Sequence, residues 1–397
     1  MGRKSQMSGA LVRKDFPNRF IIFREVGPNQ SLPKAKIVKS CLKKWKRRTI
    51  KIMKKAKLLL GIFAFALMVT LTANVFGEEK VYVMKIGLAN PVKDFHHSWS
   101  PHLVLKNEIE ARSNGRIKVE LYPGAQLGGI ESMVNMVRQG VIQGCDPAEG
   151  HLASTYPPIQ VFSIPYLFAE REIAWKVLDG PFGQKMIEDM AVKTGLRALH
   201  WSENGGFRHF SNSKREIRKP DDMKGLKIRT MNIPLHMKIV SDLGASPTPI
   251  AWAELYTSLQ TGVVDGQENS IATFLIPKLE EVQKYIILDG HVYSVNTVVI
   301  NEKWYQSLPK DLQKVIQDSQ QIALAVNRGL TVINEIMGLE YLKERGIKIY
   351  KPTKEEKQMF KEKTQTSAIK WLKEHIDPKW VDEILKATAQ AEKELGY

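Results

Sequence analysis

From residue 80 onward, hydrophobic and polar positions switch repeatedly between the period of a strand and that of a helix. Early in this part, buried strands are expected over 80–89, 116–123 and 141–145, with helices over 97–113 and 129–140 between them. Short strand candidates follow at 195–203, 226–231, 245–251 and 263–268, again separated by helical stretches. This alternation predicts an α/β fold, in which helices cover parallel sheets.

A much longer helical pattern covers 309–346, from a proline suited to a first turn to a glycine suited to a C-terminal stop. An unbroken helix of this length would extend about 55 Å, against about 30 Å for a small domain, so it would have to cross between two bodies. Gly329 and Gly338 lie inside it, and a kink or two shorter helices is the alternative. Two amphipathic helices are expected after it, capped by Thr353 and Asp377.

The N-terminal part has the layout of an export signal. A lysine-rich stretch precedes an uncharged, mostly apolar run over 58–76, and acids follow. We expect a signal peptide over 53–77, cleaved before Glu78 to release a periplasmic protein. No cysteine stands at that junction, so lipid attachment is not expected. The alternative is an uncleaved membrane anchor, since the run is just long enough to span a bilayer.

Met53 opens a complete signal by itself, so we expect residues 1–52 to be a non-native or disordered extension. The alternative is a basic cytoplasmic tail. This leader also carries the charge excess: residues 1–57 hold 18 of the 59 Lys and Arg residues and two of the 42 acids, which leaves 41 basic and 40 acidic residues beyond them. The net charge of +17 therefore reflects the leader, and no nucleic-acid partner is expected.

The exported part shows no catalytic signature. Its one cysteine, Cys145, allows no internal disulfide, so a large core must supply the stability. The sequence has no HExxH, GxSxG, P-loop or GxGxxG motif, and the adjacent His96 and His97 are a poor arrangement for two ligands of one metal. We expect a binding protein rather than an enzyme, without cofactor or metal.

Several polar side chains fall at the ends of expected strands, where open α/β sheets collect ligands. They are Arg229, Arg208, Asn269 and Glu149, with Trp252 opening a helix nearby. Two guanidinium groups and an amide can hold a carboxylate, because the planar fork matches two oxygens. Structural alternatives remain for each: an ion pair for Arg229 with an acid such as Asp221, a solvated loop position or a pair with Glu149 for Arg208, a helix cap for Asn269, and packing for Trp252.

Three segments together resemble the solute-binding proteins of tripartite ATP-independent periplasmic (TRAP) transporters, the DctP family. They are GFRHFSNSKREIRKPDDMKGLKIRTMN (206–232), LGASPTPIAWAELYTSLQTGVVDGQENS (243–270) and VFSIPYLF (161–168). The resemblance extends over 80–390. It implies a two-lobe periplasmic binding protein fold, type II-like, whose long helix crosses both lobes. On this basis lobe I is expected over 78–204 plus 295–335, and lobe II over 205–294 plus 336–397.

The resemblance also implies roles for individual residues. Arg229 would grip the ligand carboxylate in a two-pronged salt bridge, Arg208 would be a second cation contact, and Asn269 would support the carboxylate. The other implied contacts are Trp252 as an aromatic wall, Glu149 for distal polar groups, and His97 and Asn90 in the first strand-helix loop. His97 can equally be a capping or surface residue. Asn232 stands where some members differ, which leaves its role open.

The function implied by the resemblance is capture of an organic acid by cleft closure and delivery to the small and large membrane subunits of a TRAP permease. A monomer is expected, with a C4-dicarboxylate or a sugar acid as the solute. Two alternatives stay open. The chain could present its ligand to a membrane receptor as a sensor, or it could be an exported enzyme that uses Glu149 or His97 as acid or base.

Overall fold

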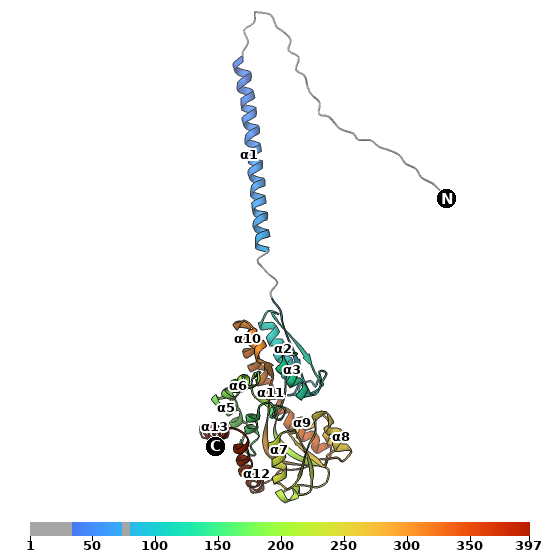
Figure 1. The fold of residues 1–397 in the computed structure, drawn as a ribbon. Coiled ribbons are helices and arrows are strands. Elements are labelled where there is room, and N and C mark those ends of the chain that lie inside the picture. Colours follow the sequence, from blue (N-terminus) through green and yellow to red (C-terminus); the bar gives the residue numbers. More distant parts are fainter. Residues whose placement is uncertain (1–33, 74–79) are drawn as a thin grey trace, which may run out of the picture. The chain divides into compact units, whose positions relative to one another are not determined.

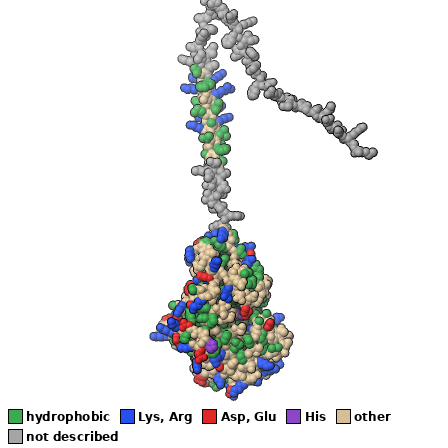
Figure 2. Space-filling view, in the orientation of Figure 1, with side chains coloured by type: hydrophobic (Ala, Val, Ile, Leu, Met, Phe, Trp, Pro, Cys, Tyr) green, Lys and Arg blue, Asp and Glu red, His purple; other side chains and the backbone are tan. Residues whose placement is uncertain are grey.

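The computed structural model describes residues 34–73 and 80–397, and the chain divides into two units. The described part of the first unit is one helix, α1 (Lys34–Ala73), which includes residues 34–52 of the expected extension. Its apolar side chains Leu60 and Phe63 are both 76% exposed, and Figure 2 shows basic and hydrophobic side chains along this helix. Residues 1–33 and the expected cleavage junction lie outside the described residues, so cleavage stays a prediction.

The second unit contains two mixed sheets, one for each expected lobe. The first has the order β2, β1, β3, β10, β4, with β10 antiparallel to both of its neighbours and the other pairs parallel. Its strands are β1 (Tyr82–Gly87), β2 (Ile117–Tyr122), β3 (Gly144–Cys145), β4 (Leu196–Ala198) and β10 (Val299–Asn301). The early strands therefore occur where the hydrophobic pattern predicts them, although β3 is shorter.

The second sheet has the order β11, β9, β5, β8, β6, β7. Its strands are β5 (Ser202–Asn212), β6 (Lys227–Thr230), β7 (Ser246–Pro249), β8 (Gly266–Asn269), β9 (Tyr285–Asn296) and β11 (Lys348–Tyr350). The long strands β5 and β9 are antiparallel, and the first sheet contains the antiparallel strand β10. The sequence pattern predicted parallel sheets, whereas both sheets are mixed. The predicted lobe boundaries at 204 and 294 fall within these two strands, and the exact bounds of the lobes stay a prediction.

Helices cover both sheets (Figure 1). The helices that lie between β1 and β5 in the chain are α2 (Ser100–Arg112), α3 (Ile130–Gln139), α4 (Glu149–Leu152), η1 (Pro157–Ser163), α5 (Arg171–Asp179) and α6 (Pro181–Thr194), and α10 (Glu302–Ser307) follows β10. The remaining short ones are η2 (Pro220–Met223), α7 (Pro234–Asp242), η3 (Trp252–Glu254), α8 (Leu255–Gln260), α9 (Ile271–Phe274) and η4 (Leu279–Glu281). At the C-terminus, α12 (Lys354–His375) packs on α7, and α13 (Pro378–Leu395) packs on α5. The predicted caps are confirmed: Thr353 accepts a hydrogen bond from the amide of Glu356 and Asp377 from that of Lys379.

The long helix α11 (Lys310–Glu344) is continuous and contacts α2 in the first lobe and both β5 and α9 in the second. Its 35 residues correspond to about 52 Å, which confirms the prediction of one helix that crosses both lobes. At Gly338 the helix passes close to α9, because a Cβ there would lie 2.9 Å from side-chain atoms of Ile271 in α9 and of Leu275, which follows it. The helix α11 is long and apolar enough to cross a membrane, but one of its faces is buried in the α/β body.

Buried apolar side chains form three clusters around this framework. One lies between the first sheet, α2 and the start of α11, with Ile86, Leu105 and Leu312 at its centre. Another joins α8, α9 and the end of α11, and the largest extends from α3 through α5 and α6 to α13. The carboxyl ends of β1, β3, β6 and β8 bear polar residues instead, and these residues surround a cavity.

Candidate functional site

Arg229 is buried near the end of β6 and is 1% exposed. Its Nε donates to the carbonyl oxygen of Ile250 over 2.9 Å, whereas its Nη1 is buried and has no hydrogen-bond partner among the described residues. Asp221, the acid considered as a partner in the sequence, pairs with Lys224 at 2.9 Å on the surface. Burial lowers the pKa of Arg229 to about 10, so the guanidinium stays charged at neutral pH in a site that disfavours the charge.

A small cavity, partly open to solvent, lies beside Arg229. It lies between the lobes, because its lining comes from both. The lining residues of the first lobe are Ala89, Asn90, Ile130, Asp146, Ala148 and His151, and the others are Asn204, Arg229, Met231, Trp252, Asn269, Thr273 and Asn296. A second, adjoining cavity shares His151, Arg229, Met231 and Trp252 and adds the exposed Asn232. The structure therefore brings five of the predicted residues to one place: Asn90, Arg229, Asn232, Trp252 and Asn269.

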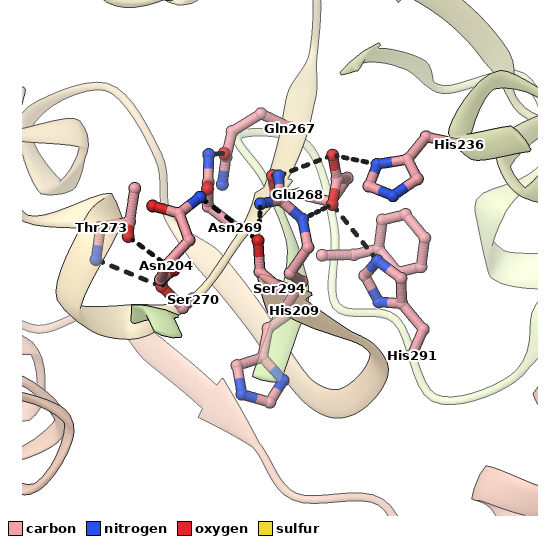
Figure 3. Close-up of polar contacts among 12 residues, drawn as sticks. Asn204, His209, His236, Gln267, Glu268, Asn269, Ser270, Thr273, His291 and Ser294 are labelled. Atoms are coloured by element: carbon pink, nitrogen blue, oxygen red, sulfur yellow. Dashed lines mark hydrogen bonds and ion pairs between the residues drawn. The ribbon is translucent and has the colours of Figure 1, made fainter. Parts of the chain in front are cut away.

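Two asparagines of the cavity have unsatisfied side-chain oxygens. The Oδ1 atoms of Asn90 and Asn296 are buried and lack a hydrogen-bond partner within the described ranges. Asn269 differs, because its Nδ2 donates to Gln267 Oε1 over 2.9 Å (Figure 3), which fixes the orientation of the amide. Buried polar atoms are normally paired, so these two oxygens, like Arg229 Nη1, indicate groups that bind a ligand or ordered water.

His151 lines the cavity but was not predicted from the sequence as a site residue, although it follows Glu149 by two residues. The amide of Ala148 donates to its Nδ1 over 3.2 Å, which leaves the proton on Nε2. Burial lowers the pKa of His151 to about 4, and Arg229 and Asp146 act on it in opposite directions. The imidazole is therefore a neutral hydrogen-bond donor at neutral pH, near both charges.

Asn204 also lines the cavity without having been predicted from the sequence. It lies at an irregularity in β5. The register with β9 shifts between Glu203 and Gly206, and Gly205 has a φ of +82°. The carbonyl oxygen of Asn204 accepts hydrogen bonds from the hydroxyls of Ser270 (3.0 Å) and Thr273 (3.1 Å) at the start of α9. A Cβ at Gly205 would lie 2.1 Å from Ser270 Oγ, so only glycine permits this approach.

Arg208 lies outside the lining of the cavity and is fully buried in an ion pair with Glu268. Its Nη2 donates to Glu268 Oε1 over 2.9 Å and its Nη1 to Ser294 Oγ over 3.0 Å. Figure 3 shows the contacts of the Glu268 carboxylate with His236 and His291. Burial by itself would raise the pKa of Glu268, but Arg208 and His236 outweigh it and hold that pKa well below its usual value. The charge of Arg208 is thus compensated inside the protein.

Glu149 is buried beside this network and is likewise not among the lining residues. Its carboxyl group accepts from Ser294 Oγ at 3.2 Å, and Ser294 in turn accepts from Arg208 and, at 3.2 Å, from Asn204 Nδ2. Burial raises the pKa of Glu149 to about 7, although Arg208 opposes this shift. In this conformation Glu149 meets the cavity only through Ser294 and Asn204.

His97 is buried where the first strand-helix loop meets α11, away from the cavity lining. Its amide donates to Asn334 Oδ1 over 2.9 Å, and its carbonyl oxygen accepts from Asn327 Nδ2 over 3.2 Å. Burial, reinforced by His96, holds the pKa of His97 well below its usual value. Within the part of the chain that the structure covers, no group of three or more His, Cys, Asp or Glu side chains is placed to hold a metal ion.

Comparison with known proteins agrees with this architecture. The family model of bacterial extracellular solute-binding proteins, family 7, matches residues 97–374. A solute-binding protein of Verminephrobacter eiseniae is 36% identical over 242 residues, which cover 61% of this chain and 72% of that protein. The 2,3-diketo-L-gulonate-binding periplasmic protein YiaO of Escherichia coli is 33% identical over 253 residues, covering 63% and 76%.

A solved structure shows the same fold. The sugar acid binding protein DctPAm of Advenella mimigardefordensis, in complex with galactonate, matches with a TM-score of 0.74 at 31% sequence identity, covering 79% of this chain and 100% of that one. These relatives are binding proteins, so the present chain is a solute-binding protein and not an enzyme. The matched residues and the two-lobe structure crossed by α11 lead to one conclusion: the chain belongs to family 7 of the bacterial extracellular solute-binding proteins, the DctP family.

Proposed function

We propose that this protein captures an organic acid between its lobes with Arg229 as the carboxylate anchor. The observation that carries the proposal is a buried guanidinium at the cavity whose Nη1 is without a partner in the described structure. Such a charge is costly until an anion arrives, and a carboxylate can engage the guanidinium in two parallel hydrogen bonds. His151 adds a neutral donor beside it, and Asn90, Asn269, Trp252 and Asn232 complete the contacts around the solute.

The other predicted contacts act indirectly in this proposal. Arg208 is neutralised by Glu268 and holds Ser294, to which Glu149 and the cavity residue Asn204 are also bonded. These residues therefore position Asn204 rather than touch the solute. His97 links the first loop to α11. Since the lining comes from both lobes, a bound acid favours the closed arrangement over the open one.

The closed protein delivers its solute to the small and large membrane subunits of a TRAP permease, and it does so as a monomer in the periplasm. Export rests on the leader. The described apolar side chains of α1, such as Leu60 and Phe63, are exposed to solvent, which suits a segment recognised by the export machinery and then removed before Glu78. With no cysteine at this junction, the mature protein is not a lipoprotein.

Titration calorimetry with organic and sugar acids tests the anchor. Micromolar binding corresponds to about 8 kcal/mol, and loss of one partner of a buried pair costs about 3 to 5 kcal/mol. Arg229→Ala should therefore weaken binding by about a hundredfold or more. Arg229→Lys should also weaken it strongly, because an ammonium group cannot reproduce the fork.

The matched control is Arg218→Ala, which removes an exposed arginine that pairs with Glu216 and should leave the affinity unchanged. Near-normal binding of the acid by Arg229→Lys would refute the two-pronged contact. Near-normal binding by Arg229→Ala would refute the anchor itself.

A further inference from the structure

The cavity carries a single basic side chain. Of the described residues that line it, Arg229 is the only lysine or arginine and Asp146 is the only acid, while the adjoining cavity adds the acid Glu131. Arg208, which would have supplied a second cation, is outside the lining and compensated by Glu268. A solute with two carboxylates would therefore find one cationic partner and would have to place its second negative charge among neutral amides or near Asp146.

Asp146 follows β3 and is 6% exposed. Its Oδ2 lies 3.2 Å from His102 Nε2, and its Oδ1 accepts a long hydrogen bond of 3.4 Å from the amide of Ala89. Asp146 and Ala89 are both lining residues of the cavity, whereas His102 is not, so the carboxylate lies at the cavity wall with His102 on its outer side. A carboxylate so placed accepts hydrogen bonds from hydroxyl groups and repels another carboxylate.

The remaining polar lining also calls for donors on the solute. The unpaired Oδ1 atoms of Asn90 and Asn296 can be satisfied by hydroxyl groups, whereas a carboxylate has no proton to donate. Leaving such buried acceptors unpaired is costly, and sites of this kind discriminate strongly against analogues that lack the hydroxyl. The donors Arg229 and His151 serve the carboxylate end, and Asn90, Asn296 and Asp146 serve the hydroxylated end.

We infer that the site selects a polyhydroxylated monocarboxylate and rejects the corresponding dicarboxylate, with Asp146 as the residue that enforces this choice. The inference rests on the proposed function, because it takes Arg229 as the carboxylate anchor. Of the two solute classes expected from the sequence, C4-dicarboxylates and sugar acids, it retains only the sugar acids. It also makes Asp146, which was not predicted from the sequence, a determinant of specificity.

Calorimetry with matched acids tests this selection. Galactonate carries one carboxylate, and each of its five remaining carbons bears a hydroxyl group. In galactarate a second carboxylate replaces the terminal hydroxymethyl group. Hexanoate has the carboxylate and the same chain length but no hydroxyl groups. The series is repeated with stereoisomeric aldonates and with threonate, tartrate and butyrate, to cover configuration and chain length. At least one aldonate should bind about tenfold or more tightly than its matched diacid and its matched simple acid.

The inference is overturned if a diacid or a simple acid binds as tightly as every aldonate, or if no aldonate binds. A different result would refute the proposed function: the acid that binds most tightly to the wild-type protein, whatever its class, would bind equally well to Arg229→Ala. A diacid that binds to the wild-type protein and is lost in Arg229→Ala would thus refute the selection and leave the anchor intact.

The Asp146→Asn variant tests the named residue. This variant removes the repulsion and presents an amide. The affinity for the diacid divided by the affinity for its matched aldonate should therefore rise about tenfold or more, measured with galactarate and galactonate or with whichever matched pair binds. The control is Asp318→Asn, a half-buried residue of α11 that pairs with Lys314 at 2.8 Å and lies outside the cavity lining, which should leave the ratio unchanged. An unchanged ratio in an Asp146→Asn protein that still binds the aldonate would overturn the role of Asp146. The wild-type series decides the selection even if this variant does not fold.

Discussion

Replacing Arg208 by methionine should destabilise the ligand-free protein, whereas replacing Arg229 by methionine should not. Both side chains are almost fully buried and both are cationic. Arg208 has a buried carboxylate partner, Glu268, and a hydroxyl partner, Ser294. Arg229 has a backbone carbonyl at Nε and an unpaired Nη1 in the described structure. Methionine keeps much of the apolar stem and removes the charge.

The magnitudes follow from these surroundings. Arg208→Met removes the main partner of the buried carboxylate of Glu268, and breaking a buried ion pair in this way costs about 3 to 5 kcal/mol. For Arg229, burial lowers the pKa from its usual value to about 10 in the folded protein. At about 1.4 kcal/mol per pH unit, the buried charge destabilises the closed fold by an amount on the order of 3 kcal/mol at neutral pH. Opening of the lobes hydrates the group, so Arg229→Met should change the unfolding free energy by between about 0 and +3 kcal/mol.

Urea-induced unfolding at neutral pH, without added acid, measures both values. Arg218→Met provides the baseline, since this arginine is exposed and should contribute within about 0.5 kcal/mol. The reasoning is refuted if Arg229→Met lowers the unfolding free energy as much as Arg208→Met does. It is equally refuted if Arg208→Met has no effect, because its charge would then not be compensated inside the protein.

Two further predictions concern Glu149 and the irregularity in β5. The folded chain holds the pKa of Glu149 at about 7, above its usual value, so the stability due to this group is full below about pH 4.5 and is lost as the pH rises towards about 7. Glu149→Gln should reduce the loss of unfolding free energy between about pH 5 and about pH 8 by roughly 2 to 3 kcal/mol in urea titrations, and an unchanged pH profile would contradict the assigned burial. Gly205→Ala should destabilise the protein by more than Gly115→Ala in thermal unfolding: both positions have φ near +80°, but only at Gly205 would the new Cβ meet another residue. Equal effects would show that backbone conformation, and not the contact with Ser270, requires the glycine.

The elements predicted from local pattern occur where they were expected. The strands near 80–89 and 116–123, the helix near 129–140 and the capped C-terminal helices depend on residues a few positions apart, so their signals are complete in the sequence. The long strand β5 was anticipated only in part, because Gly205 and Gly206 interrupt its pattern. Its continuity depends on β9 and on the start of α9, which are distant in sequence.

The candidate site divides in the same way. Residues at strand ends, such as Arg229 and Asn269, could be expected at a common edge, since the sheet brings strand ends together. Asn204 and Asn296 could not, because they reach the cavity from the two strands that join the lobes. Asp146 and His151 flank Glu149 in sequence, yet they line the cavity while Glu149 turns to Ser294. No periodicity in a short helix reveals which of its side chains faces the opposite lobe.

The sequence by itself determined the alternation of strands and helices, the length of α11 and the presence of two arginines suited to a carboxylate. Only the tertiary structure decided which arginine remains uncompensated. The pairing of β5 with β8 brings Glu268 to Arg208, whereas Arg229 on the neighbouring β6 meets a backbone carbonyl and the cavity. The physical reason is that the state of a buried charge depends on the groups packed around it, and those groups come from strands that are far apart in the chain.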